Sequence, residues 1–403
     1  MVGNKQITKM KILVVFSRNL YFIEGAPSNR FRSIFEGLGK RNYAVHIIIT
    51  GGYYNWTEYF FHKKYKYPKN IFIYYTGFPY QMRILKKIKY QSLQSQLIIN
   101  KQKKIQSENI FDFGWITFGL GYNTYLESIS LFKNSGAKMI QEVSEHPILF
   151  MSKTEFNRYL ELILPQIDFI FVMTNNLLEF YKKHIDKNTN LCHIPMTVDL
   201  DRFSKSKSIN KEDIYVISYV GLMNNGKDGV DILIKAFTLV SKKYKNVKLQ
   251  LIGPYKPQAD YFEQLNYIKN NDLEDKIQYL GEKSRDEIPQ LLIDSDCLVL
   301  ARPNSKQAQF GFPTKLGEYL ATSNPVIVTS VGEIPFYLKN NVNAFVAKPN
   351  DINDFADKIL NVFRNKSNAI IVGEKGYQVA NKFFNTEIQS NAIDKVLKEN
   401  SPK

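Results

Sequence analysis

Cysteine is scarce in this chain of 403 residues: Cys192 and Cys297 are the two present, and they lie far apart. This scarcity excludes a disulfide-stapled scaffold and a cysteine-based zinc site, and it favours a reducing compartment. No run of about 18 or more apolar residues occurs, so we expect no membrane-spanning helix. The first apolar stretch, Ile12–Phe16, is too short for a signal-peptide core. We therefore expect a cytoplasmic protein whose contact with membranes is at most peripheral.

Acidic residues are absent between Tyr59 and Ser107, although the whole chain has 38 of them against 54 lysines and arginines. The basic residues of this tract are Lys63, Lys64, Lys66, Lys69, Arg83, Lys86, Lys87, Lys89, Lys101, Lys103 and Lys104. Such a tract fits nucleic acid, an anionic membrane surface or an anionic substrate, and a merely solvated surface is the remaining alternative. Aliphatic residues among the lysines of 84–89 are typical of an interfacial helix. Of these partners we favour peripheral membrane contact through the 63–104 tract.

Length indicates two domains, because a single hydrophobic core stops growing well before 403 residues. Short apolar runs alternate with longer periodic segments, the pattern of parallel sheets covered by helices on both faces. The predicted strands of the first half are Lys11–Ser17, Val45–Thr50, Ile71–Tyr75, Gly114–Phe118, Lys138–Gln141 and Phe169–Met173. Those of the second half are Ile214–Val220, Lys248–Ile252, Ile277–Leu280, Cys297–Leu300 and Val326–Thr329. The expected fold class is α/β, with two Rossmann-like domains.

A polar tract, SKSKSINKED, separates the two halves and is typical of a linker. We expect an N-terminal domain over residues 1–198, a linker over 199–213 and a C-terminal domain over 214–375. Residues 376–403 are expected to form a C-terminal helix that packs back on the N-terminal domain. Ligands of open parallel sheets bind beyond the carboxyl ends of the strands, so the functional residues should follow the strands.

A glycine-containing loop, Gly221–Gly229, follows the strand that ends at Val220 and opens the next helix. Exposed backbone N–H groups, a helix N-terminus and the ammonium of Lys227 suit a phosphate group. Glycines in such turns are mostly structural, so this loop alone leaves both interpretations open.

The segment ARPNSKQAQFGFPTKLGEYLATSNPVI, residues 301–327, is the richest in candidate residues. Pro313 can stand just inside a helix start, with Thr314 and Lys315 beside it. Unpaired N–H groups and an ammonium then converge where a diphosphate could lie. Arg302 adds a guanidinium fork for phosphate.

Glu318 lies one turn further along the same predicted helix. A carboxylate there can accept two hydrogen bonds from a ribose diol, as an acidic residue does in dinucleotide sites. The structural alternative is an ion pair between Glu318 and Lys315 on a surface helix.

Three segments together carry a resemblance to a known family: the one at 301–327, VGLMNNGKDGVDILIKAF before it, and IPMTVDLDRF at the domain junction. They resemble the donor-binding half of family 4 retaining glycosyltransferases (glycosyl transferases group 1). The resemblance covers residues 190–350 well and the N-terminal half loosely. It implies a GT-B fold, in which two Rossmann-like domains face each other across a cleft. It also implies transfer of a hexose-type sugar from a UDP- or GDP-sugar to a hydroxyl with retention of configuration, without a metal or other cofactor.

The resemblance makes Glu318 the second glutamate of the family's E-x7-E motif, which contacts the ribose. The first glutamate falls on Phe310, and Gln307 or Gln309 are the side chains available to substitute for it. The donor-binding residues implied in this way are Lys227, Arg302, Gly311, Phe312, Pro313, Thr314, Lys315, Glu318, Gly281 and Glu282. Of these, Gly281 and Glu282 match a loop that lines the nucleobase in the family.

The family's arginine after the first strand of the second domain falls on Leu222 in this chain. Lys227 matches the lysine that accompanies this arginine in the family. Arg302 is the residue whose guanidinium is available to replace the missing arginine. With these side chains and helix N-termini to neutralise a leaving diphosphate, and with no Asp-x-Asp pair after a strand, we expect no metal site.

The implied catalytic residues lie in the first half: Gly25, Glu145 and His146. Gly25 follows the first strand and matches the family's glycine loop near the donor phosphate and the acceptor. Glu145 and His146, in the segment QEVSEHP, match a cleft loop that faces the acceptor hydroxyl or the sugar. The alternatives are an incidental loop histidine and, for Glu142 or Glu145, a helix cap.

The acceptor is expected to be a glycan or a lipid-linked intermediate of surface polysaccharide synthesis, at the inner face of the membrane. Two alternatives remain open. One is a nucleotide-sugar epimerase or a phosphorylase on the same fold. The other is a basic nucleic-acid-binding protein, although no recognisable nucleic-acid motif supports it.

Overall fold

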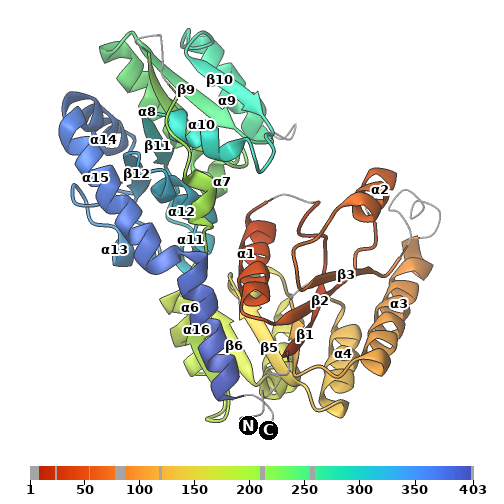
Figure 1. The fold of residues 1–403 in the computed structure, drawn as a ribbon. Helices are drawn as coiled ribbons and strands as arrows, with labels where there is room; N and C mark the ends of the chain where they lie inside the picture. Colours follow the sequence, from red (N-terminus) through yellow and green to blue (C-terminus); the bar gives the residue numbers. More distant parts are fainter. Residues whose placement is uncertain are drawn as a thin grey trace. The chain divides into compact units, whose positions relative to one another are not determined.

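The computed structural model describes residues 9–22, 25–53, 55–77, 87–117, 120–208, 214–254 and 259–400. The chain divides into two units. The first runs up to Ile194 and includes the C-terminal segment from Gln389, and the second runs from Pro195 to Ile388. In each unit helices flank an open parallel sheet (Figure 1). The predicted α/β class with two Rossmann-like domains is confirmed.

The first sheet has the strand order β3-β2-β1-β4-β5-β6-β7, and every neighbouring pair is parallel. Its strands are β1 (Lys11–Phe16), β2 (Ala44–Ile49), β3 (Ile71–Tyr75), β4 (Phe113–Ile116), β5 (Lys138–Val143), β6 (Phe169–Val172) and β7 (Asn190–His193). Its helices are α1 (Ala26–Lys40), α2 (Trp56–Lys64), α3 (Lys87–Glu108), α4 (Tyr122–Asn134), α5 (Lys153–Arg158), α6 (Asn175–Lys182) and α16 (Thr386–Glu399). The central strands are buried along nearly their whole length, as parallel strands with two covered faces require.

The second sheet has the order β10-β9-β8-β11-β12-β13 and is also parallel throughout. Its strands are β8 (Tyr215–Val220), β9 (Val247–Ile252), β10 (Ile277–Gly281), β11 (Cys297–Leu300), β12 (Val326–Thr329) and β13 (Phe345–Ala347). Its helices are α7 (Asn225–Asp228), α8 (Val230–Lys243), α9 (Ala259–Asn270), α10 (Ile288–Asp294), α11 (Lys306–Phe310), α12 (Thr314–Ala321), α13 (Ile334–Tyr337), α14 (Ile352–Arg364) and α15 (Lys366–Val379). A 3-10 turn, η5 (Leu200–Phe203), precedes β8.

The C-terminal part of the chain splits between the units. Ile393 and Leu397 of α16 are fully buried in the core of the first unit, and Asp394 accepts a hydrogen bond from the Tyr43 hydroxyl at 2.8 Å. Residues 376–388, which we assigned to the same packing segment, instead belong to the second unit. The reason is that α15 packs on α12 and α14 of that unit.

The predicted linker, 199–213, is also placed differently. The units divide between Ile194 and Pro195, so residues 199–208 belong to the second unit, and 209–213 lie outside the described residues. Phe203 is buried, which anchors η5 against α10 and α12. The polar tract at 204–213 therefore does not mark the boundary between the two units.

The segment by which the chain enters the second unit and the segment by which it leaves that unit pair with each other. The Val198 N–H donates to the Phe384 carbonyl at 2.7 Å, and the Thr386 N–H donates back to the Val198 carbonyl at 3.1 Å. The same entering segment packs on α12: a Cβ at Gly317 would lie 2.3 Å from the Cε of Met196. The first and last stretches of the second unit thus lie beside each other.

The eleven predicted strands are present; three of them, β3, β11 and β12, have the predicted ends, and the ends of the other eight are shifted. The strand predicted at 114–118 is β4, Phe113–Ile116, and Phe118 lies outside the described residues. We missed β7, whose four residues are half-buried and mixed in polarity, and β13, which has three residues. Of the interfacial helix expected at 84–89, residues 84–86 lie outside the described residues, and α3 begins at Lys87. Among the described helices, none is long and apolar enough to cross a membrane.

Candidate functional site

The second sheet has a topological switch point between β8 and β11. From β8 the chain adds β9 and β10 on one side, and it then returns to add β11, β12 and β13 on the other. Ligands of open parallel sheets bind outside the carboxyl ends of the strands that flank such a point. The loops that leave β8 at Gly221 and β11 at Ala301 therefore frame the candidate site.

Two glycines allow close approach in these loops. Gly221 has a φ of 155°, and a Cβ there would lie 2.0 Å from the Nζ of Lys315 and 2.6 Å from the hydroxyl of Tyr219. Gly229 has a φ of 68°, and a Cβ there would lie 2.1 Å from the carbonyl oxygen of Ala301. Only glycine adopts such backbone without strain and leaves this space free. The predicted glycine loop is thus needed for the packing of the site.

Lys315 is the centre of a buried polar cluster. Its Nζ lies 2.7 Å from Oδ2 of Asp228 and 3.1 Å from the hydroxyl of Tyr219, which itself donates to Asp228 at 2.9 Å. Burial lowers the pKa of Lys315; Asp228 opposes this, and the charges of Arg302 and Lys227 reinforce it. Burial alone would raise the pKa of Asp228, but Lys315 and Arg302 outweigh it and hold the pKa below its usual value.

The cluster therefore combines three predicted cations from three segments that are separate in sequence. Lys227 comes from α7, Arg302 from the end of β11 and Lys315 from the first turn of α12, and the carboxylate bonded to Lys315 is that of Asp228. The first turn of a helix also leaves N–H groups without intrahelical partners. A doubly charged anion such as a diphosphate would balance the remaining positive charge.

Glu318 lies one turn after Lys315 on α12, and Arg202 holds its carboxylate. Nη1 of Arg202 lies 2.7 Å from Oε1 of Glu318, and Nη2 donates to the Arg285 carbonyl at 2.6 Å. Lys315 is paired with Asp228 instead of Glu318. The surface ion pair that we considered as the structural alternative is therefore not formed.

Four predicted residues build the start of α12. The Gly311 N–H donates to a carbonyl of α11 at 3.0 Å and so ends that helix, and Phe312 is buried among aromatic rings of the second unit. Pro313 caps α12 and Thr314 is its first residue. The backbone of this segment thus places Lys315 in the first turn of α12.

Gly281 and Glu282 lie where β10 ends, at the same edge of the sheet as the cluster around Lys315. Gly281 has a φ of 68° and open space on the side where a Cβ would stand. Its carbonyl accepts the N–H of Gly253 at 2.8 Å, which joins the loops after β9 and β10. Glu282 is exposed.

In the first unit, Gly25 precedes α1 with a φ of 147° and has open space where a Cβ would stand. The helix that it opens, α1, begins at Ala26. Glu145 is half-buried and follows β5, at the same carboxyl edge of the first sheet.

His146 is buried and caps the turn Pro147–Leu149. Its Nδ1 accepts the N–H of Ile148 at 3.2 Å, and its ring lies 4.5 Å from that of Phe180. Burial, and secondarily the charge of His184, lowers the pKa of His146. This capping role accounts for the histidine locally, and its catalytic role stays a prediction.

Glu142, for which we considered a helix cap, lies within β5 and pairs with Arg30. The Nε of Arg30 is 2.7 Å from Oε1 of Glu142, and both side chains are 2% exposed. The helix cap proposed for Glu142 was wrong, because Glu142 lies in a strand and its carboxylate pairs with Arg30 of α1, which is distant in sequence.

The sequence interpretation missed the residues that hold the predicted ones in place: Tyr219, Asp228 and Arg202. Asp228 follows Lys227 directly, and an acid next to a lysine in a loop looks like a solvated pair. Arg202 is part of the junction segment quoted for the resemblance, which was the available signal for its importance.

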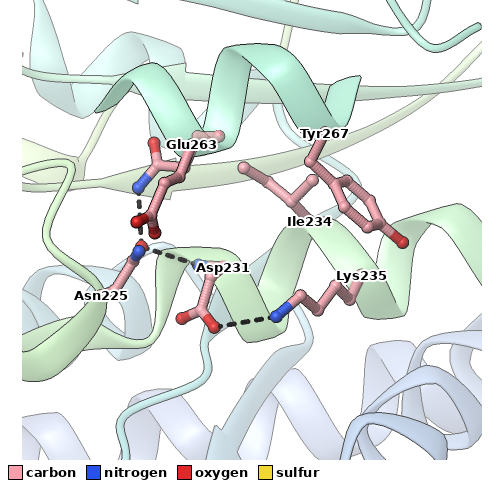
Figure 2. A pocket seen from close by; sticks show the side chains of 7 residues that line it. Asn225, Asp231, Ile234, Lys235, Glu263 and Tyr267 are labelled. Carbon is pink, nitrogen blue, oxygen red and sulfur yellow. Dashed lines mark hydrogen bonds and ion pairs between the residues drawn. The ribbon is translucent and has the colours of Figure 1, made fainter. Parts of the chain in front are cut away.

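A separate cavity of about 180 Å³ lies between α8 and α9. Figure 2 shows Lys235 reaching back to Asp231, at 3.3 Å, on one wall. On the other side, Asn225 Oδ1 accepts a hydrogen bond from Gln264 at 2.7 Å. None of the predicted site residues lines this cavity.

Comparison with known sequences identifies a family over much of the second unit. Residues 214–365 match the profile of the family described as glycosyl transferases group 1. An uncharacterized glycosyltransferase of Methanocaldococcus jannaschii is 30% identical over 205 residues, 51% of this chain and 53% of that protein. The N-acetyl-alpha-D-glucosaminyl L-malate synthase of Bacillus anthracis is 23% identical over 244 residues, 59% of this chain and 61% of that protein. The chain thus matches little more than half the length of these relatives.

Comparison with solved structures covers nearly the whole chain. The Anabaena protein HepE in complex with UDP and glucose superposes with a TM-score of 0.73 over 97% of this chain and 100% of that one, at 14% identity. At this identity the similarity shows the fold alone, which is the two-domain α/β fold named GT-B.

Proposed function

Because residues 214–365 form a domain of the glycosyl transferases group 1 family, we propose that this protein is a glycosyltransferase of the hexosyltransferase type. It moves a sugar from a nucleoside-diphosphate sugar, a UDP- or GDP-sugar, to an acceptor hydroxyl and retains the anomeric configuration. The observation that carries the proposal is the cationic cluster at the switch point, where Lys315, Arg302 and Lys227 converge beside Asp228. Fixed positive charges at this position stabilise the negative charge that develops on a leaving diphosphate.

The remaining roles are those that the family resemblance implies, and the places of the residues in the fold are compatible with them. Glu318 accepts hydrogen bonds from the ribose hydroxyls, since its carboxylate is ordered one turn from Lys315. The loop at Gly281 and Glu282 faces the nucleobase from the end of β10. Gly25, Glu145 and His146, at the carboxyl edge of the first sheet, are assigned to the acceptor and the transferred sugar. Support for a nucleotide-sugar donor also comes from HepE, whose structure contains UDP and glucose.

A thermal-shift panel of UDP, GDP, ADP and CMP tests the donor site, on the wild type and on Glu318→Ala, in the presence of EDTA. One nucleoside diphosphate at 100 times its Kd should stabilise the wild type by about 2.7 kcal/mol, and Glu318→Ala should lose most of that effect. Asp231→Ala is the matched control, because it removes a carboxylate of the same unit on the wall of the separate cavity. Stabilisation by none of the nucleotides would contradict the donor proposal.

A product assay without acceptor separates the proposal from its enzymatic alternatives. An epimerase converts the nucleotide sugar by itself, and a phosphorylase needs inorganic phosphate, whereas a transferase leaves the donor largely intact until an acceptor is added. Rapid conversion of the sugar without acceptor would favour the alternatives.

For the acceptor, the proposal extends to a lipid-linked or surface-polysaccharide intermediate at the inner face of the membrane. The support is a stripe on the exposed side of α2, made of Trp56, Phe60, Lys63 and Lys64. Trp56 is 47% and Phe60 55% exposed, and helical spacing places all four on one face. Aromatic rings beside lysines are typical of helices that lie in a membrane interface.

Sedimentation with vesicles of phosphatidylglycerol and phosphatidylcholine tests this contact. Replacing Lys63 and Lys64 by glutamate should weaken binding to the anionic vesicles by about fivefold or more for each lysine. The same change at Lys242 and Lys243, an exposed pair in the last turn of α8, should have little effect. Equal loss in both double variants would indicate unspecific charge attraction. Steep salt-dependent binding to DNA instead of vesicles would favour the nucleic-acid alternative.

A further inference from the structure

Arg202 joins two parts of the proposed donor site that are distant in sequence. It lies in η5, shortly after the chain enters the second unit. One nitrogen of its guanidinium, Nη1, contacts Glu318 of α12 at 2.7 Å. The other, Nη2, donates to the carbonyl of Arg285, between β10 and α10, at 2.6 Å. A single planar group therefore connects the proposed ribose-binding carboxylate with the loop that follows Gly281.

This contact is well enclosed and geometrically specific. The side chains of Arg202 and Glu318 are 12% and 15% exposed. The ring of Phe203 lies 5.4 Å from the guanidinium carbon and limits its movement. A guanidinium with both terminal nitrogens engaged in a fixed fork orients its partner carboxylate much better than a single flexible ammonium would.

The contact also leaves the carboxylate able to accept further hydrogen bonds. Arg202 engages Oε1 of Glu318, and Oε2 makes no hydrogen bond with the part of the chain that the structure describes. An ionised carboxyl group has about four lone-pair positions, so a diol can still be bound by two of them. The pairing with Arg202 fixes the plane of the carboxylate, which an acceptor for two hydroxyls requires.

We propose that Arg202 is a positioning residue for donor recognition. It holds the Glu318 carboxylate in the orientation that receives the 2′- and 3′-hydroxyls of the ribose, and it holds the base-facing loop through Arg285 at the same time. This inference rests on the proposed function, in which Glu318 binds ribose. The opposite possibility is that Arg202 competes with ribose for Glu318, in which case removing it strengthens binding.

The test measures a ribose preference, defined as the Kd of a 2′,3′-dideoxynucleoside diphosphate divided by that of the ribonucleotide. UDP, GDP and ADP are titrated by calorimetry, and the dideoxy form is used for each one that binds. The variants are Arg202→Met, Arg202→Gln and, as a rescue, Arg202→Lys. Lys207→Met is the matched control: Lys207 lies in the same segment, its Nζ is 2.8 Å from Asp296, and it does not touch Glu318.

The wild type and Lys207→Met should prefer the ribonucleotide by about tenfold or more, as hydrogen bonds to a charged group imply. Arg202→Met should lose at least about fivefold of this preference, and Arg202→Lys should regain part of it. If the methionine variant folds poorly, the glutamine variant gives the same answer, because the preference is a ratio in which the unfolded fraction cancels.

Three results would overturn the inference. If the wild type prefers the ribonucleotide and Arg202→Met shows the same preference, the positioning role is refuted, but the proposed donor site is not. Tighter binding by Arg202→Met shows competition instead. A wild type that binds none of the three diphosphates, or binds them without ribose preference, refutes the proposed donor site and this inference together.

Discussion

Methionine in place of Lys315 is expected to abolish measurable binding of nucleoside diphosphates and to lower the free energy of unfolding of the second domain by about 3–5 kcal/mol. The two side chains are similar in length, so the apolar stem keeps its packing while the charge is lost. Asp228, whose side chain is 4% exposed, is then left without the ammonium that lies 2.7 Å away. A buried carboxylate that loses its partner accounts for most of the expected destabilisation.

A second change separates stability from binding. Adding Asp228→Asn to Lys315→Met should recover much of the stability, because no uncompensated charge remains, but it should not restore binding. Urea unfolding followed by far-ultraviolet circular dichroism and calorimetric titration with UDP and GDP measure the two quantities. Lys235→Met is the matched control, since its pair with Asp231 is 41% and 31% exposed and should matter by less than about 1 kcal/mol. Wild-type affinity in Lys315→Met would contradict a phosphate site at this cluster.

Loss of Arg30 should strongly destabilise the first domain. Arg30→Met leaves Glu142 unpaired at 2% exposure and also removes the hydrogen bond of 2.8 Å to the carbonyl of Ile194, for a loss of about 3–5 kcal/mol. Burial raises the pKa of Glu142, and Arg30 opposes that rise. Without Arg30 the folded protein binds a proton there more readily than the unfolded chain does. The destabilisation should therefore shrink as the pH is lowered.

Tryptophan fluorescence measures this loss selectively, because both tryptophans of the chain, Trp56 and Trp115, lie in the first unit. Adding Glu142→Leu to Arg30→Met should restore part of the stability, since no buried charge remains. Arg32→Met is the matched control on the same helix, where the ion pair with Glu36 is partly exposed and the loss should stay near 1 kcal/mol or less. A loss of similar size in both arginine variants would contradict a special role for the buried pair.

The sequence predicted the strands because buried parallel strands are short apolar runs. The predicted Cys297–Leu300 and Val326–Thr329 agree with β11 and β12 at both ends. The edge strand β7 could not be recognised in this way, because an edge position does not require a fully apolar sequence. The boundary at Pro195 was also hidden, since the polar tract that follows it reports solvent exposure and not the end of a core.

In the candidate site, the sequence predicted Lys315 and Glu318 as ligand-binding residues, but it did not indicate the residues that contact them. Lys315 and Glu318 were predicted from their place at a helix start. Their partners, Asp228 and Arg202, are 87 and 116 positions away in sequence. Contacts over such separations depend on tertiary packing, which no local pattern contains. The replacement of the missing family arginine by Arg302 stays a prediction, to which its electrostatic effect on Lys315 and Asp228 adds support.

The pairing of Val198 with Phe384 and Thr386 has a consequence for how this protein can be rearranged. Residues 195–388 enter and leave their unit at hydrogen-bonded neighbours, so the stretch is a continuous cassette whose two ends meet. A short linker can join those ends, and new termini can then be opened in a surface loop, which is the geometry that circular permutation requires. Recombination likewise needs only two nearby joints to exchange the whole cassette, and with it the residues around Lys315, for that of another protein.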